Sequence, residues 1–367
     1  MKKRNKKLLL CWLARPIRLA RTKTGKSFLV LFFKKELLSS RSALPFLFHL
    51  GGLGDISAGV RCFVLLALLA IPGTAFAACN ARPVAELPLA EYRGKLFLPV
   101  SIQGSPQQIA LDTGAAVTVI STQTANELEI LHDFDRHMDV GGVGGADSIL
   151  YIGKVDHFDL GPLHFTHQNF PIVDLPLRTP SGSPVAGFLG ADILHNFDVE
   201  IDISAGRLVL WPAACAGAAP SWADGATRMD IGLDGGYHVL VPMRIHGVNL
   251  TALLDTGAGG LALTTRAALR AGLSDDSLAD DPDMQGTGVN NRGWHGHFHR
   301  FDRVTIADVN FADVPAGIVP SGNLAAYDGL GGADALLGEE LLRHMRLLIS
   351  YRTHTLFMQQ LQQRAAD

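Results

Sequence analysis

The stretch Ala110-Leu111-Asp112-Thr113-Gly114-Ala115 recurs as Leu253-Leu254-Asp255-Thr256-Gly257-Ala258. In both copies an apolar run ends in an aspartate at a Thr-Gly turn. The residues ahead of the turns also align without a gap, residues 98–104 against residues 241–247, so each residue of the second copy lies 143 positions after its counterpart. One Asp-Thr-Gly arises readily by chance, whereas two in register within a repeat predict a duplicated unit with paired aspartates.

Short apolar stretches separated by turn residues predict an all-β protein with brief helices. Leu96, Leu98, Val100 and Ile102 share one face at a period of two, which is typical of a half-buried antiparallel strand. Later signals keep the same order in both halves, and Leu-Leu-Gly at 336–338 repeats Phe-Leu-Gly at 188–190. We therefore expect two lobes related by a pseudo-two-fold axis, at residues 79–211 and 226–367, with a Pro/Gly-punctuated linker at residues 212–225.

The chain begins with a strongly basic segment. Residues 1–62 hold 14 of the 32 basic residues and 2 of the 35 acidic ones, so the remainder carries a net charge of −15. An acidic body argues against a nucleic-acid partner, which requires positive charge on the protein. Residues 1–60 are interpreted as a basic extension, a second membrane segment or a region upstream of the true translation start.

Residues 61–78 have the pattern of a signal peptide: Arg61, a short apolar run, a Pro72-Gly73 break and the small-residue site Ala75-Phe76-Ala77. This predicts an exported protein, periplasmic or secreted, and the alternative is a membrane anchor formed by the same residues. Cleavage after Ala77 would leave two cysteines, Cys79 and Cys215. In an oxidising compartment they can form one disulfide, and two free thiols are the alternative.

The paired aspartates indicate hydrolytic chemistry. A pseudo-two-fold arrangement would bring Asp112 and Asp255 together between the lobes, and two carboxylates that close share one proton over a wide pH range. One carboxylate can then accept a proton from water while the other donates a proton to a carbonyl oxygen. This chemistry hydrolyses an amide bond without a cofactor, a metal or a covalent intermediate.

Each half resembles a retropepsin-type aspartic protease monomer, and the whole resembles a bilobal pepsin-like enzyme made by fusion. The resemblance is carried by Asp-Thr-Gly-Ala, by the glycine cluster at residues 140–145, and by the apolar-apolar-Gly signatures that end at Gly190 and Gly338. It implies an aspartic endopeptidase with a peptide or protein substrate, and the signal-peptide pattern predicts that this enzyme is exported. Because one chain holds both lobes, we expect a monomer.

The same resemblance implies a role for each matching residue. Asp112 and Asp255 would be catalytic, and four residues would support their turns: Thr113, Gly114, Thr256 and Gly257. The glycine cluster is similar to a retroviral protease flap, which closes over substrate, and its alternative is a flexible hairpin tip. The expected flap residues are Gly141, Gly142, Val143, Gly144 and Gly145 in the first half, and Gly286 and Gly288 in the second.

Two other functions are compatible with the sequence. A protein with the same fold could bind peptides or envelope components without hydrolysing them. His295, His297 and His299 alternate, so they would share one face of a strand, as metal ligands can. Surface histidines are the default interpretation of this cluster, and no metal or cofactor is predicted. Activity that fails with a chelator but survives Asp255→Asn would favour a metal-dependent hydrolase.

Overall fold

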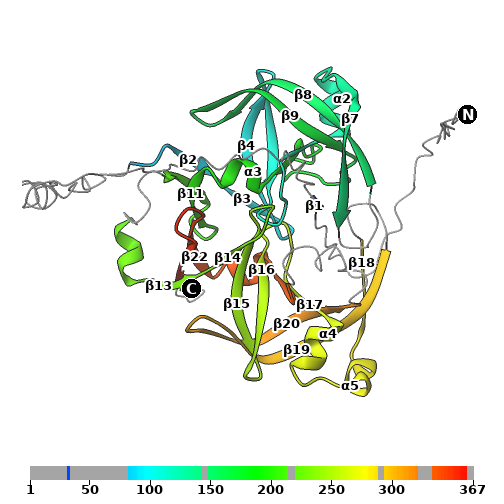
Figure 1. Cartoon of the computed structure of the whole chain (residues 1–367), viewed down its shortest axis with the longest axis vertical. Helices are drawn as coiled ribbons and strands as arrows, with labels where there is room; N and C mark the ends of the chain where they lie inside the picture. The colour runs from blue at the N-terminus through cyan, green and yellow to red at the C-terminus, as the bar shows by residue number, and fades with distance from the viewer. Residues whose placement is uncertain are drawn as a thin grey trace, which may run out of the picture.

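The structure is a computed structural model that describes residues 31–33, 82–142, 148–213, 220–287, 293–320 and 333–361. Within these residues the chain forms two β-rich lobes and a sheet to which both lobes contribute (Figure 1). The predicted all-β bilobal fold is confirmed. The predicted signal peptide at residues 61–78, Cys79 and Cys215 lie outside the described residues.

The first lobe is built on a nine-stranded sheet. Its first strand, β1, pairs antiparallel with β7, and an additional pairing of β4 with β8 curls the sheet on itself. In spatial order the strands are β1 (Leu31–Phe33), β7 (His132–Gly142), β8 (Ser148–Leu160), β9 (Leu163–Val173), β6 (Val119–Ser121), β10 (Gly187–Leu189), β5 (Ser105–Leu111), β4 (Lys95–Ile102) and β3 (Ala90–Tyr92).

The second lobe repeats this order in an eight-stranded sheet. The pairing of β15 with β19 corresponds to that of β4 with β8 in the first lobe. From edge to edge the strands are β14 (Gly232–Leu233), β15 (Val239–Ile245), β16 (Val248–Leu254), β21 (Ala335–Leu337), β17 (Leu261–Thr264), β20 (Val309–Val319), β19 (Gly293–Ile306) and β18 (Asp283–Thr287).

A six-stranded antiparallel sheet joins the lobes. At its centre β11 of the first half pairs with β22 of the second half, and Glu200 lies opposite Leu348. These two residues are 148 positions apart, as are Gly190 and Gly338, so they occupy equivalent places in the two halves. A pseudo-two-fold axis therefore passes close to this pair. The strands are β13 (Thr227–Asp230), β23 (Thr355–Gln360), β22 (Met345–Ser350), β11 (Phe197–Asp202), β12 (Arg207–Pro212) and β2 (Ala85–Pro88).

The helices are short. Ser121 caps α2 by accepting a hydrogen bond from the amide of Thr124, and Thr264 caps α4 in the same way through the amide of Ala267. The described helices are α2 (Thr122–Glu127), α3 (Ala191–Leu194), the 3₁₀ helix η2 (Ser221–Gly225), α4 (Thr265–Arg270), α5 (Asp275–Asp280) and α7 (Glu339–Leu342). None of these described helices has the length and apolar character needed to cross a membrane.

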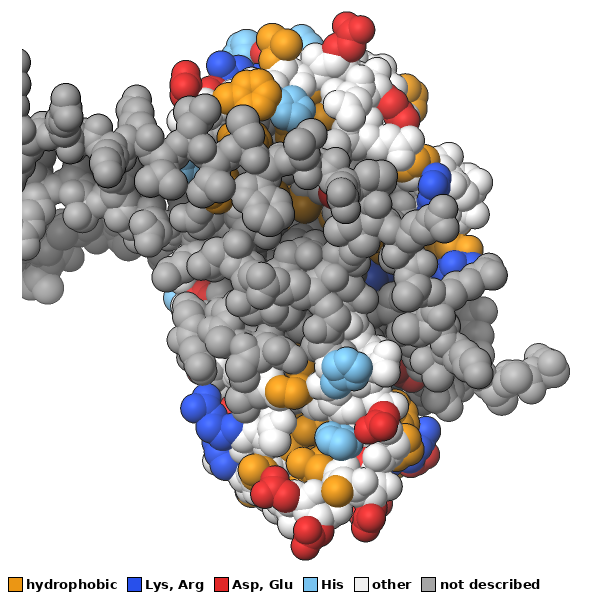
Figure 2. All heavy atoms as spheres, turned by 90° about the vertical axis from the view of Figure 1, so that its right-hand side faces the viewer, with side chains coloured by type: hydrophobic (Ala, Val, Ile, Leu, Met, Phe, Trp, Pro, Cys, Tyr) orange, Lys and Arg blue, Asp and Glu red, His pale blue; other side chains and the backbone are white. Residues whose placement is uncertain are grey.

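The core follows the predicted alternation, with one addition. Leu96, Leu98, Val100 and Ile102 are all buried on β4, as their spacing predicts, and Lys95 at the start of the strand is buried too. On the described surface seen in Figure 2, acidic, basic and histidine side chains are interspersed over both lobes. Among the described side chains on that face, Lys and Arg form no continuous basic surface of the kind that binds a phosphate backbone.

Candidate active site

Two equivalent strands deliver the two aspartates to the seam between the lobes. Asp112 follows the last residue of β5, and Asp255 follows the last residue of β16. Each strand pairs in parallel with β10 or β21, and the amides of Asp112 and Asp255 continue these ladders by donating to Leu189 and Leu337 at 3.1 and 3.0 Å. The direction of both turns is thus set by buried sheet structure.

The two threonines connect the lobes across the seam. The amide of Thr113 donates to Oγ1 of Thr256, and the amide of Thr256 donates to Oγ1 of Thr113, both at 3.0 Å. Each hydroxyl then donates to a carbonyl of the opposite lobe, Thr113 to Leu254 at 2.8 Å and Thr256 to Leu111 at 3.0 Å. These four buried hydrogen bonds fix the position of one aspartate turn relative to the other.

The glycines that follow the threonines allow the carboxyl groups to approach each other. A Cβ atom at Gly114 would lie 2.5 Å from the carboxyl carbon of Asp255, and one at Gly257 would overlap the carboxyl group of Asp112. Each glycine amide also donates to the aspartate of its own turn, at 3.0 Å to Asp112 and 2.7 Å to Asp255. Both carboxyl groups therefore converge on the seam, and both are fully buried.

The protonation of this aspartate pair is set by burial and by charge. Burial raises the pKa of Asp112 well above its usual value, the charge of Asp255 raises it further, and the Lys95 ammonium opposes both. Burial also raises the pKa of Asp255, while Lys95 and the amides of Gly257 and Ala258 favour its charged form. No donor in the described part of the chain reaches Oδ2 of either aspartate. One proton shared by the pair satisfies this geometry.

The apolar-apolar-Gly signatures pack closely against the two aspartate turns. A Cβ at Gly190 would lie 2.5 Å from the carbonyl carbon of Val117, so only glycine permits this approach. The first amide of α3 donates to Ala115 at 2.8 Å, and the first amide of α7 donates to Ala258 at the same distance. These short helices hold the turns by backbone contacts that the sequence signature alone does not specify.

The predicted flap residues are only partly described. Gly141 and Gly142 lie at the end of β7, which forms a hairpin with β8, while Val143, Gly144, Gly145 and Gly288 lie outside the described residues. Gly286 lies in β18, opposite Trp294 of β19. Both lobes therefore present a hairpin at the equivalent place, and the flap role of these residues stays a prediction.

The histidines of the 295–299 segment lie on β19. Nδ1 of His299 is 2.7 Å from Asp281, and Nδ1 of His297 is 4.0 Å from Asp283. His295 is exposed. Nowhere in the described ranges do three His, Cys, Asp or Glu side chains gather closely enough to hold a metal ion. The geometry thus gives the metal-dependent alternative no support from the described residues.

Sequence reasoning missed two buried basic residues at equivalent positions of the two lobes. Lys95 donates to the carbonyl of Gly257 in the opposite lobe, and it influences the pKa of both aspartates. His238 occupies the equivalent position in the second half, 143 residues later, and is also fully buried. The repeat register was the signal that could have found them, because it aligns Lys95, the first residue of β4, with His238, the residue before β15.

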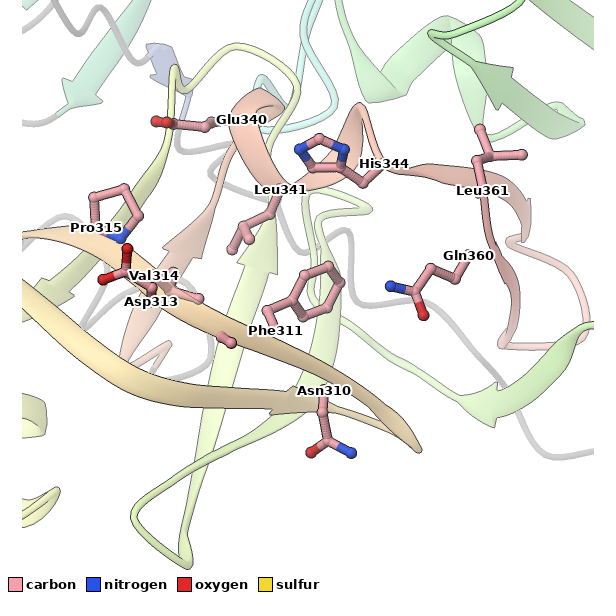
Figure 3. Close-up of a pocket in the computed structure, with 11 residues that line it drawn as sticks. Asn310, Phe311, Asp313, Val314, Pro315, Glu340, Leu341, His344, Gln360 and Leu361 are labelled. Atoms are coloured by element: carbon pink, nitrogen blue, oxygen red, sulfur yellow. The ribbon is translucent and has the colours of Figure 1, made fainter. Parts of the chain in front are cut away.

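A cavity of about 780 Å³ lies in the second lobe, away from the aspartate pair (Figure 3). Phe311 and Val314 of β20 line one side of it, and Leu341 and His344, from α7 and the residues after it, line the other. Neither aspartate borders this cavity, so it belongs to a different surface of the protein.

Comparison with known proteins gives two findings. A model of the family described as "Aspartyl protease" matches this chain twice, at residues 98–193 and 241–341, which is more than half of its length and one match in each lobe. The chain is also similar to DNA damage-inducible protein 1 of Chaetomium globosum, with 29% identity over 119 residues. That match spans 31% of this chain and 24% of the relative's length.

Proposed function

Because the chain belongs to the aspartyl protease family, with a retropepsin-like unit in each lobe, we propose that it is an exported aspartic endopeptidase. The observation that carries the proposal is the convergence of Asp112 and Asp255 across the four threonine hydrogen bonds. It supports a pair of carboxyl groups that share a proton and hold one water molecule between them. The signal-peptide pattern at residues 61–78 supports export, and the presence of both lobes in one chain supports a monomer.

We assign Asp255 as the general base and Asp112 as the general acid. Oδ1 of Asp255 accepts hydrogen bonds from two amides, Gly257 and Ala258, whereas Oδ1 of Asp112 accepts one, from Gly114. An additional amide donor favours the charged carboxylate at Asp255. The charge of Asp255 in turn favours the protonated form of Asp112.

In the proposed reaction the water oxygen attacks the carbonyl carbon of the peptide bond. Asp255 accepts a proton from the water while Asp112 donates its proton to the carbonyl oxygen, which gives a tetrahedral diol. Asp255 then donates its proton to the amide nitrogen, Asp112 takes a proton from one diol hydroxyl, and the carbon–nitrogen bond breaks. The products are a carboxylic acid and an amine, and both aspartates return to their starting protonation.

An extended peptide suits this site better than a small substrate. Each lobe presents a β-hairpin, β7–β8 and β18–β19, whose main-chain groups could bind an extended strand by β-augmentation. We therefore propose the class of unfolded or extended segments of proteins as substrate.

The test is hydrolysis of a mixed peptide pool by the purified protein between pH 3 and pH 8. Asp112→Asn and Asp255→Asn keep the shape of each side chain but remove the acid–base chemistry. We expect wild-type cleavage to fall by about 10²–10⁴-fold in each variant, while peptide affinity changes little. Peptide binding with no cleavage by the wild type at any pH would instead favour the non-hydrolytic binding module.

A further inference from the structure

A tight hairpin turn places Lys95 at the seam between the lobes. The turn residues Arg93 and Gly94 both have positive φ, 54° and 71°, which is the backbone of a two-residue type I′ turn. A Cβ at Gly94 would lie 3.7 Å from Gly259 and from Glu339 of the opposite lobe, so the turn is packed against that lobe. Lys95 follows at the start of β4 with 5% of its surface exposed.

The ammonium of Lys95 faces a group of acidic side chains. Burial lowers the pKa of Lys95, and the charges of three carboxylates oppose this effect: Asp255, Asp112 and Glu339, in decreasing order of influence. Glu339 has a cation of its own, because Arg343 donates to it at 2.5 Å on the same helix. The positive charge of Lys95 is therefore balanced mainly by the aspartate pair.

Charge balance decides which form of the pair this site favours. A buried net charge is costly, whereas a buried cation and anion in contact neutralise each other. With Lys95 charged, the three groups are neutral when the pair carries one negative charge in total. They carry a net charge of +1 when both aspartates are protonated and −1 when both are ionised.

We propose that Lys95 is a positioning residue whose buried ammonium neutralises the aspartate pair and holds it in the singly ionised form. This inference rests on the proposed function only for its effect on catalysis, since the singly ionised pair is the form that can both accept and donate a proton. Lys95 does not reach the substrate in this scheme. It acts through Asp255, Asp112 and the carbonyl of Gly257, to which it donates.

The second lobe shows why Lys95, and not its counterpart, has this role. His238 occupies the equivalent position, but its Nδ1 lies 2.7 Å from Asp234, whose oxygen also accepts from the amide of His238. Burial opposes ionisation of Asp234, yet the contacts with His238 hold its pKa below the usual value. The basic residue of the second lobe therefore has a dedicated carboxylate partner, and the arrangement around the aspartate pair is asymmetric.

The test is the pH dependence of thermal unfolding in the full chain carrying Lys95→Met, which keeps the length of the side chain but removes its charge. Without the ammonium, ionising the buried pair leaves an uncompensated negative charge. The unfolding midpoint of the variant should therefore fall relative to wild type as the pH rises from 4 to 8, by roughly 5 °C or more. Lys154→Met is the matched control, because Lys154 is exposed and pairs with Asp133 at the surface.

A difference between variant and wild type that is the same at pH 4 and pH 8 would overturn the proposal. If Lys95→Met is unfolded at pH 7, the proposal requires it to be folded at pH 4 and rescued at pH 7 by adding Asp255→Asn. Failure of either result would also overturn the proposal. None of these readouts needs turnover, so an inactive wild type that shows this pattern refutes the proposed function and leaves the role of Lys95 intact.

The pH profile of peptide hydrolysis gives a second readout that a merely structural lysine would not change. Removing a nearby positive charge raises the pKa of both aspartates, so both limbs of the profile should move to higher pH in Lys95→Met. An opposite charge at this range typically changes a carboxyl pKa by about one unit or more. A change in the rate alone, with both limbs in place, contradicts the proposal.

Discussion

Thr256→Val tests whether the threonine hydrogen bonds hold the two aspartate turns together. Valine has nearly the same shape but cannot accept a hydrogen bond from the amide of Thr113 or donate one to the carbonyl of Leu111, both at 3.0 Å in the structure. Both of these backbone groups belong to the buried seam. A buried polar group that loses its partner costs about 1–3 kcal/mol, so the two groups together should cost the variant about 2–6 kcal/mol of unfolding free energy.

The assay is denaturant unfolding, followed both by fluorescence and by peptide hydrolysis on the same samples. Thr113→Val should cost a similar amount, because its hydroxyl makes the equivalent bonds to Thr256 and Leu254. Thr305→Val is the matched control, since the Thr305 hydroxyl donates to the side chain of Asn310 on a surface hairpin, and it should change stability by less than about 0.5 kcal/mol. A loss in Thr256→Val no larger than in Thr305→Val would refute the reasoning.

Three further predictions follow from the same geometry. Gly114→Ala places a methyl group against the carboxyl group of Asp255, so peptide hydrolysis should fall by at least about 10²-fold and the thermal unfolding midpoint should drop. Enzyme kinetics and thermal unfolding measure the two effects, and unchanged kinetics would contradict the convergence of the carboxyl groups. Because the pKa values of Asp112 and Asp255 are raised in the folded protein, the pair stabilises the fold fully below the unfolded carboxyl pKa of about 4, and this stabilisation is lost as the pH rises towards the folded pKa values. Unfolding midpoints should therefore decline with pH less steeply in Asp112→Asn than in wild type. Equal slopes would argue against a coupled pair. Glu200→Gln removes the buried carboxylate that binds Arg346 of the other half at 2.6 Å, so the free energy of unfolding in denaturant should fall by about 3 kcal/mol. A neutral effect would show that this ion pair does not hold the shared sheet together.

The all-β bilobal fold could be predicted because its signals are local and repeated. The period of two from Leu96 to Ile102 depends only on which face of one strand is buried, and the structure buries all four residues. The repeat at 143 residues predicted that the aspartates would lie at equivalent places. Two equivalent turns that lie close to a two-fold axis approach each other across it, and the structure brings Asp112 and Asp255 together in this way.

The shared sheet could not be predicted from the sequence. Its central strands, β11 and β22, resemble other short strands of the chain, and nothing in them specifies that Glu200 lies opposite Leu348 of the other half. Such pairings join residues that are far apart in the chain, so local sequence patterns do not predict them. The strand position of Gly286 could not be predicted either. Glycine alone is a poor strand former, and pairing with β19 supplies the missing stabilisation.

Lys95 and Glu339 were missed because charged residues are rarely buried without partners. From the sequence, Lys95 ends a hairpin turn and Glu339 begins a helix, and both positions are usually exposed. Their burial follows from packing of one lobe against the other, which brings an ammonium to the aspartate pair and Arg343 to Glu339. Only a comparison of the two halves, Lys95 against His238, would have marked the position as unusual.

The most direct test of the account is whether Asp112 and Asp255 act as one chemical unit. The measurement is kcat/KM for peptide hydrolysis in Asp112→Asn, Asp255→Asn and the double variant, with folding verified by circular dichroism. Groups that act as a unit are strongly non-additive, so each single variant should lose about as much activity as the double variant. A single variant that keeps substantial activity, or losses that simply add, would contradict a proton shared between these two carboxyl groups.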